Sequence, residues 1–251
     1  MQLENIFIPS ITEFYNMDPR KRKIYSYVIP TDDGSAPNPY WGICTLAICK
    51  PAIRRTARPG DWVIGTGSKR SPLGDISKKL VYAMQVEQVV TMKTYDLISR
   101  VIDSRKIPCF ETEQNSLDLF QILGDCIYDF SGSRSNPRQR KGVHIRDNKN
   151  KDLRGENVLT SSNFYYFGDR PIDIPSISLP TNPSKNLQDI IKNNEGHRKI
   201  EDEETIELFE NWLASLNLSP GLYGNPQMLL KVYRNLMSRG LIKKRNSIRM
   251  I

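Results

Sequence analysis

The chain has 251 residues, of which 38% are hydrophobic and 25% charged, and 36 basic side chains against 28 acidic ones give a net charge of +8. This composition is typical of a globular protein with a substantial core, and it excludes collagen-like, coiled-coil and small disulfide-rich chains. No run approaches the roughly 20 apolar residues that span a bilayer. The first residues lack the basic and apolar regions of a secretory signal, so we expect a cytoplasmic location and no membrane contact.

The first two thirds of the chain predict strands separated by turns and short helices. Runs of β-branched and aromatic residues bounded by charged, Gly or Pro residues indicate strands, and these cover residues 24–29, 62–68, 80–90 and 158–168. A helix is expected after Lys50, where Pro51 would occupy the first turn. A second short helix is expected after Thr91, whose hydroxyl suits an N-cap.

The C-terminal part shows a different pattern. Beyond a proline-punctuated stretch, apolar residues recur at helical spacing in two places, at Ile206, Phe209, Leu213 and Leu216 and again at Leu229, Val232 and Leu236. We therefore expect a domain over residues 1–175, a linker over 176–199 and a helical appendage over 200–251.

Basic residues gather in three blocks. Residues 20–23 form the first, residues 131–155 hold eight basic against two acidic side chains, and seven basic residues without an acidic one follow from Lys231. Each Lys or Arg on a phosphate adds salt-sensitive affinity, so the blocks favour DNA as partner, whereas solvated loops and a frayed tail are the other interpretation. The candidate phosphate-binding residues are Arg54, Arg55, Lys69, Arg70, Arg138, Arg140 and Lys141.

Residues 32–41, DDGSAPNPYW, form a loop rich in rigid and polar residues. Aromatic rings stack a base and carboxylate or amide groups read its edge, so the loop predicts a base-binding pocket; a well-packed turn is the alternative. The candidate stacking rings are Tyr40, Trp41 and Trp62. Residues 65–70, GTGSKR, lack the P-loop spacing. Two interpretations fit them equally: glycines at the end of a strand, or a backbone segment that approaches a phosphate group closely.

Metal and cofactor binding are not indicated. Cys44 and Cys49 are four residues apart, but no second cysteine pair follows at metal spacing, and His144 and His197 lie in no ligand pattern. We expect neither a metal nor a cofactor, and free buried thiols.

Residues 32–68 resemble the second nucleotide modification associated domain family. The shared patterns are D-x-G-x-A-P-N-P at 32–39, C-T-L-A-x-C-K-P-x-I-R at 44–54 and G-D-W-V-x-G-T-G-S at 60–68, and residues 124–128 and 158–168 also look similar. The resemblance extends over roughly residues 24–175. One departure is RQRKGVHIRD at 138–147, where the family has a segment rich in serine and histidine. The resemblance implies a link to hypermodified bases in DNA, often in antiviral defence against phage.

The order of elements also resembles that of PUA-like base-reading domains. This resemblance implies an α+β fold, a PUA-like mixed β-barrel with short helices and a C-terminal helical appendage. The sequence Asn38-Pro39-Tyr40 is similar to the water-positioning loop of uracil-DNA glycosylases.

Three functions follow from these patterns. The favoured one is a DNA glycosylase, a hydrolase that flips out a hypermodified base, with Asp32, Asp33, Asn38 or Asp125 positioning water and stabilising the oxocarbenium-like sugar. The second is a non-catalytic reader of the modified base that recruits an effector protein. The third is an RNA- or nucleotide-binding module, ranked last because no RNP-type aromatic motif is present.

Overall fold

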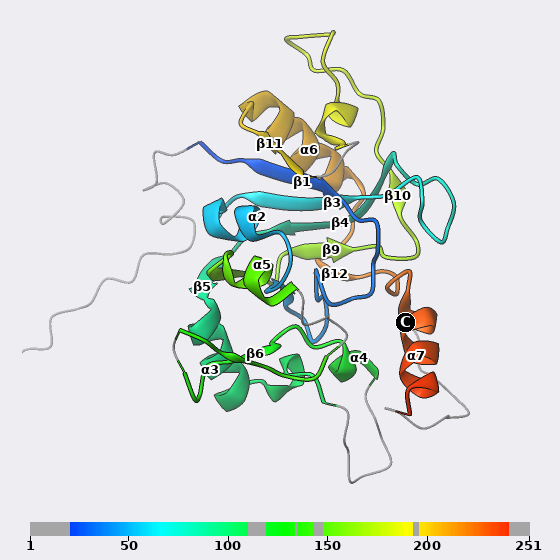
Figure 1. Ribbon diagram of the computed structural model, residues 1–251. Helices are drawn as coiled ribbons and strands as arrows, with labels where there is room; N and C mark the ends of the chain where they lie inside the picture. Colours follow the sequence, from blue (N-terminus) through cyan, green and yellow to red (C-terminus); the bar gives the residue numbers. More distant parts are fainter. Residues whose placement is uncertain (1–20, 110–118, 134, 143–147, 193–195, 241–251) are drawn as a thin grey trace, which may run out of the picture.

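The computed structural model describes residues 21–109, 119–133, 135–142, 148–192 and 196–240. In this part of the chain a mixed sheet of seven strands has the order β11-β1-β3-β4-β9-β12, with β10 paired to β4 (Figure 1). Its strands are β1 (Ile24–Val28), β3 (Trp62–Thr66), β4 (Lys79–Gln85), β9 (Phe164–Tyr166), β10 (Ile172–Asp173), β11 (His197–Ile200) and β12 (Gly221–Leu222). The strand pairs β1–β3 and β9–β12 are parallel.

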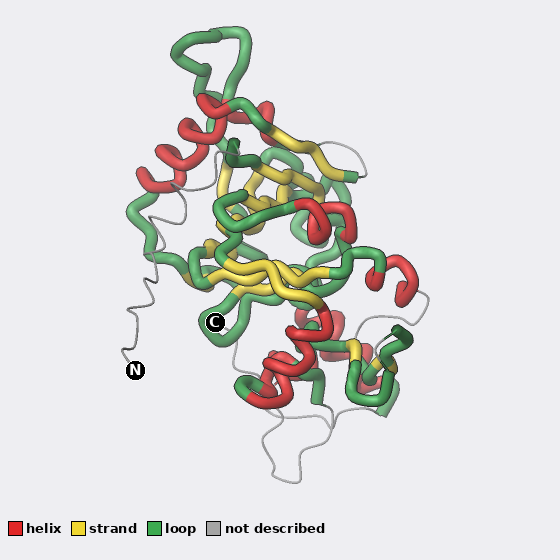
Figure 2. The backbone as a smooth tube through the Cα atoms, turned by 90° about the vertical axis from the view of Figure 1, so that its left-hand side faces the viewer, coloured by secondary structure: helices red, strands yellow, loops and turns green. Residues whose placement is uncertain are grey.

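Two small sheets and several helices complete the fold. The sheet β2-β8-β5 consists of β2 (Cys44–Leu46), β8 (Asn157–Ser161) and β5 (Gln88–Thr91), and β6 (Tyr128–Asp129) pairs with β7 (Arg138–Gln139). The helices are α2 (Pro51–Thr56), α3 (Met92–Val101), α4 (Leu119–Ile122), α5 (Lys149–Leu153), α6 (Glu203–Ser215) and α7 (Leu229–Ser238), with 3-10 turns η1 (Ser104–Lys106) and η3 (Leu187–Ile190). Figure 2 shows the strands at the centre with helices on either side.

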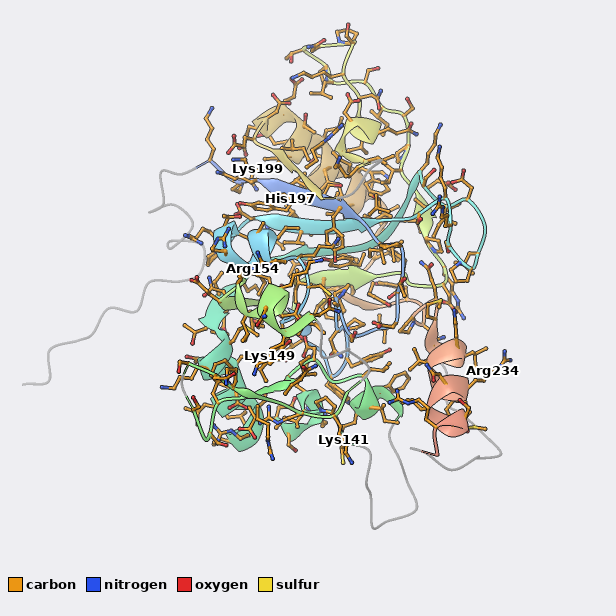
Figure 3. The ribbon with its side chains drawn as sticks, in the orientation of Figure 1. Lys141, Lys149, Arg154, His197, Lys199 and Arg234 are labelled. Carbon is orange, nitrogen blue, oxygen red and sulfur yellow. The ribbon has the colours of Figure 1, made fainter. Side chains whose placement is uncertain are left out.

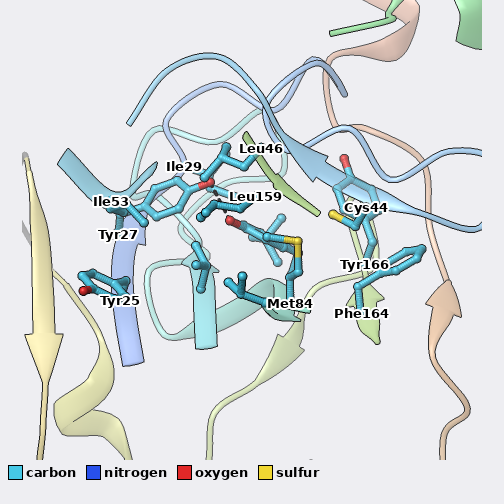
Figure 4. Close-up of a cluster of buried hydrophobic side chains, with 14 of the residues drawn as sticks. Tyr25, Tyr27, Ile29, Cys44, Leu46, Ile53, Met84, Leu159, Phe164 and Tyr166 are labelled. Carbon is cyan, nitrogen blue, oxygen red and sulfur yellow. Dashed lines mark hydrogen bonds between the residues drawn. The ribbon is translucent and has the colours of Figure 1, made fainter. Parts of the chain in front are cut away.

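Both faces of the main sheet are covered, which explains its nearly continuous apolar strands. On one face, Tyr27 and Met84 pack with Leu46 and Leu159 of the second sheet (Figure 4). On the other face, side chains of β1 and β3 pack with α6 in a cluster that includes Ile24, Trp62, Ile64, Ile206 and Phe209. Consecutive residues of β1 alternate between these two cores, as the period of a strand requires.

The expected barrel is wrong, because the described residues form open layers. The main sheet ends at β11 and at β12, and no pairing found in the described chain joins these two edges. The runs 80–90 and 158–168, each expected as one strand, pass from one sheet to the other, giving β4 then β5 and β8 then β9. At the two crossing points, the Ser162 main-chain N–H and hydroxyl both donate to the Glu87 carboxylate, at 2.7 and 3.0 Å.

Local signals for the helices are confirmed. Pro51 opens α2, and the Thr91 hydroxyl accepts a hydrogen bond from the Thr94 N–H at 3.0 Å, so that it caps α3. The spacing of apolar residues also predicted α6 and α7.

The C-terminal elements pack closely on the rest of the chain. β11, which begins within the expected linker, pairs with β1, and Phe209 of α6 lies 5.3 Å from Trp62, ring centre to ring centre. Arg22 forms ion pairs with Glu203 and Glu210 of α6 at 2.5 and 2.8 Å. Part of the first basic block therefore forms ion pairs within the protein. The division of the chain into domains remains a prediction.

Replacing Phe209 by Ala is expected to lower the free energy of unfolding by about 3–5 kcal/mol, because a fully buried ring leaves a cavity shared by α6 and the sheet. Urea unfolding followed by tryptophan fluorescence and by circular dichroism measures the effect. Both probes should shift together. The exposed Ile177→Ala variant is the control, and separate transitions for the two probes would instead indicate that α6 unfolds independently of the sheet.

Candidate nucleic-acid interface

A hairpin over residues 38–45 forms the centre of the predicted loop. The Asn38 N–H donates to the Thr45 carbonyl at 2.8 Å and the Thr45 N–H donates back at 2.9 Å. The Asn38 amide is fully buried and its Nδ2 donates to the carbonyls of Leu123 and Gly34, at 2.9 and 3.2 Å. The amide thus fixes the entry to the hairpin.

The buried ammonium of Lys106 closes this hairpin from η1. Its Nζ lies 2.7 Å from Asn38 Oδ1, 2.8 Å from the Ile43 carbonyl and 3.2 Å from both the Asn38 carbonyl and Thr45 Oγ1. Four oxygens surround a group with three protons, so every proton has an acceptor. Lys106 therefore ties the two ends of the hairpin to a segment distant in sequence.

Asp125 supplies the negative charge that balances Lys106. Thr45 Oγ1 and the Tyr95 hydroxyl each donate to its carboxylate at 2.6 Å. Burial raises the pKa of Asp125, opposed by the charge of Lys106, and burial lowers the pKa of Lys106, opposed by the charge of Asp125. The carboxylate and ammonium therefore depend on each other for charge compensation.

A small cavity lies beside Asp125, with space comparable to one water molecule. Its walls are Ala47, Met92, Tyr95, Asp125, Cys126, Ile127, Tyr128 and Val158. It is too small for a nucleobase.

Asp32 occupies a second buried site, separate from these hydrogen bonds. The Tyr166 hydroxyl donates to Asp32 Oδ1 at 2.6 Å, and the Gln227 N–H donates to Oδ2 at 3.3 Å. Burial raises the pKa of Asp32 to about 7, outweighing these hydrogen bonds, which lower it. The neighbouring Asp33 is partly exposed, and its carboxylate accepts the Ser35 N–H and hydroxyl.

The three predicted stacking rings do not form one cage. Tyr40 is buried against Phe120, with ring centres 4.5 Å apart. Trp62 lies in the core under α6, where its Nε1 donates to Glu210 at 2.9 Å. Trp41 alone is partly exposed, and the Arg105 Cζ lies 5.8 Å from its ring centre.

The predicted phosphate-binding residues divide into buried and exposed groups. The Arg54 guanidinium is fully buried and donates to the carbonyls of Cys49, Asn157 and Asp152. It therefore joins α2, α5 and β8. A side chain at Gly155 would contact this guanidinium at 2.3 Å, so the position requires glycine. Arg140, with only 12% of its side chain exposed, pairs with Asp96 at 2.6 Å.

The remaining candidates are exposed but lie apart. Arg55 lies on α2, before β3, whereas Lys69 and Arg70 follow β3 at its other end. Arg138 pairs with Asp129 at 3.1 Å and remains largely exposed, and Lys141 follows β7.

One face carries a row of basic side chains, which we call the cationic row: Lys199, His197, Lys50, Arg55, Arg154, Lys149 and Lys141. Figure 3 shows the labelled members one below another from β11 to the segment after β7.

Contacts confirm that the elements carrying this row are neighbours. His197 is in register with Tyr27, and the Lys50 Nζ lies 4.2 Å from the centre of the same Tyr27 ring. Arg55 Nη1 donates to the Arg154 carbonyl at 3.3 Å. On helix α5, which ends just before Arg154, Lys149 Nζ donates to the Asn136 side chain at 2.7 Å, and Asn136 lies in the loop that leads to β7.

His197 is one of three partly buried members of the row, with Lys50 and Lys149. Burial lowers its pKa, and Lys50, Lys199 and Lys192 lower it further. Three lysines therefore place positive charge around this imidazole.

Thiol and metal chemistry have little support in the described residues. No group of three or more His, Cys, Asp or Glu side chains is placed there to hold a metal ion. Burial raises the pKa of Cys44 to about 12 and of Cys49 to about 11, so these free thiols stay protonated at neutral pH. His144 lies outside the described residues. No helix in the described chain has the length and apolarity to cross a membrane.

Comparison with known proteins identifies the family. The model of the nucleotide modification associated domain 2 family matches residues 21–233. The chain belongs to this family. The match extends through α6 and into α7, beyond the stretch that carries the sequence resemblance. No curated protein and no solved structure gives a significant match. Membership associates the protein with nucleotide modification.

Sequence patterns did not point to several residues that organise this nucleotide modification associated domain. Lys106 and Tyr95 stand in no recognisable motif, and their roles, like that of Tyr128, arise from partners far along the chain. The Tyr128 hydroxyl donates to Asp152, which also accepts the Cys49 N–H. Only the similarity of residues 124–128 to the family indicated that this region matters.

Lys106→Met is expected to lower the free energy of unfolding by about 3–5 kcal/mol, because it leaves a buried carboxylate without its cation. Thermal or urea denaturation measures the loss. Combining it with Asp125→Asn should cost less than the sum of the single changes. Strict additivity would contradict the coupling, and the exposed Lys93→Met variant controls for the loss of a surface charge.

The raised pKa of Asp32 makes the free energy of unfolding depend on pH. In the unfolded chain its carboxyl loses a proton near its ordinary pKa, whereas the folded protein keeps the proton up to about pH 7. Between about pH 4 and about pH 7 the folded state binds more protons, so this group makes stability fall as pH rises, by up to about 1.4 kcal/mol per pH unit. Asp32→Asn should flatten the curve in urea titrations across this range. Asp33→Asn should keep the wild-type slope, and an unchanged slope in Asp32→Asn would contradict the assignment.

Proposed function

We propose that this nucleotide modification associated domain is a reader that recognises a modified base in duplex DNA. The observation that carries the proposal is the cationic row, a series of exposed and partly exposed basic side chains in a member of this family (Figure 3). Its Arg55 and Lys149 donate to a carbonyl and an amide oxygen rather than to carboxylates. Their charges thus remain available to neutralise DNA phosphates.

Recognition without hydrolysis fits the surroundings of two predicted catalytic groups. Asn38 and Asp125 are buried and hydrogen-bonded to Lys106, Leu123, Thr45 and Tyr95. A group that activates water needs hydrogen-bond reach to the water and the sugar. Both side chains are instead used to shape the hairpin that faces the ligand.

Asp32 supports excision as a second candidate function. A carboxyl with a pKa of about 7 is suited to exchange a proton with water at neutral pH. Its neighbour Asp33 is partly exposed in the same loop. In a glycosylase, a shift of this loop would bring Asp32 to a flipped nucleotide. The succession β1, β2, α2, β3, β4 supports a PUA-like relationship, with an open sheet in place of a barrel.

Binding and excision are separated by one experiment on the full chain. Duplexes containing glucosylated hydroxymethylcytosine or plain cytosine are compared by fluorescence anisotropy, and the recovered DNA is assayed for abasic sites. Preferential binding with intact DNA is the expected result. Abasic sites that are formed by the wild type and lost in Asp32→Asn would establish excision instead. Equal affinity for both duplexes, or preference for an RNA competitor, would overturn the proposal.

Loss of cationic-row contacts should weaken DNA binding and its salt dependence together. The slope of log K against log salt is expected to become shallower by about 0.9 for each phosphate contact removed, so Arg55→Ala and Lys149→Ala should each show this change. Lys185→Ala, an exposed lysine outside the row, should retain the wild-type slope. Identical slopes in all three variants would show that DNA lies on another face.

A further inference from the structure

The tip of the hairpin has an unusual backbone. Trp41 and Gly42 adopt φ values of 62° and 80°. Positive φ is a genuine outlier for a bulky residue, and it persists only where the surroundings enforce it. Here Lys106 and Asn38 hold the base of the hairpin in place. These contacts, and the packing of Trp41 against the cluster that contains Tyr40, define the conformation of the tip.

This tip presents apolar side chains to solvent. Ile43 is 44% exposed and Trp41 is partly exposed, whereas Tyr40 between them and the core is buried. The Tyr40 ring stacks with Phe120 and lies 5.6 Å from the Trp41 ring, centre to centre. The buried ring supports the outer ring from behind.

Cationic groups stand beside the Trp41 ring, which is partly exposed and packs against the buried cluster that contains Tyr40. The Arg105 Cζ and the Lys106 Nζ lie 5.8 and 5.5 Å from the Trp41 ring centre. More than half of the Arg105 side chain is exposed, and its Nε and Nη2 donate to the Asp103 carboxylate at 2.7 and 2.9 Å, so a phosphate would share this guanidinium with Asp103. Aromatic rings with adjacent arginine are the combination that stacks on bases and contacts the phosphates next to them.

The tip is continuous with the lower end of the cationic row. The Cys126 N–H donates to the Lys106 carbonyl at 3.0 Å. Arg140 in turn donates to the Cys126 carbonyl at 3.0 Å, and Lys141 of the row follows it in the chain. Hydrogen bonds through Cys126 and Arg140 thus connect the base of the hairpin to the segment that carries Lys141.

We propose that Trp41 and Ile43 form a wedge that enters the DNA base stack beside the recognised base, while Arg105 contacts the adjoining phosphate. This inference rests on the proposed DNA binding. Apolar wedges between base steps unstack them and help to extrude or kink the duplex. The buried Lys106 is the positioning residue that makes the wedge stiff enough to separate stacked bases.

The test uses a duplex with 2-aminopurine next to the modified base, because this fluorescent base brightens when it loses its stacking partner. The wild-type chain is expected to bind and to brighten the probe. Trp41→Gly keeps a residue suited to the positive φ, and it should bind about tenfold more weakly without brightening. Ile43→Ser, an exposed position that tests the wedge without touching the core, should also reduce brightening.

A matched control and a second readout separate the two proposals. Leu73 is 44% exposed, like Ile43, but lies on the loop after β3, so Leu73→Ser should brighten the probe as the wild type does. Anisotropy reports binding in the same samples. Wild-type binding with a dark probe, or full brightening by both Trp41→Gly and Ile43→Ser, would overturn the wedge alone. Absence of any DNA binding would overturn the proposed function and the wedge with it.

Discussion

One buried charge holds together the hairpin over residues 38–45. The Lys106 ammonium is enclosed by oxygens of the hairpin over residues 38–45, and Asp125 balances it through Thr45. An isolated buried charge is strongly unfavourable, so these segments are stable only when all of them are in place. The path of the hairpin, including the left-handed backbone of Trp41, follows from this mutual requirement.

Elements encoded by neighbouring residues were predicted from the sequence, and elements decided by distant contacts were not. The Pro51 start of α2, the Thr91 cap and the apolar spacing of α6 are local features, and all three are confirmed. The passage of two apolar runs between sheets depends on Glu87 meeting Ser162, 75 residues further along. Alternation and turn composition do not reveal that contact, and the barrel was expected from the resemblance to PUA-like domains.

The family was recognisable from its motif, but the part that each residue plays was not. From the sequence alone, an arginine that binds a phosphate cannot be told from one that donates to three main-chain carbonyls inside the fold, as Arg54 does. Lys106 is 68 residues from Asn38 and stands in no motif, so the sequence contained no sign of their contact. Exposure separates the two kinds of basic residue, and exposure is a property of the packed chain.

The crossing of two chain segments between the sheets also restricts how the protein can move. Residues 79–91 and 157–166 each contribute a strand to both layers. If one layer slid over the other, both of these covalently continuous segments would have to change conformation. Shear between the two sheets is therefore opposed, and the scaffold behaves as a rigid unit. Conformational change is then confined to the loops that connect the strands.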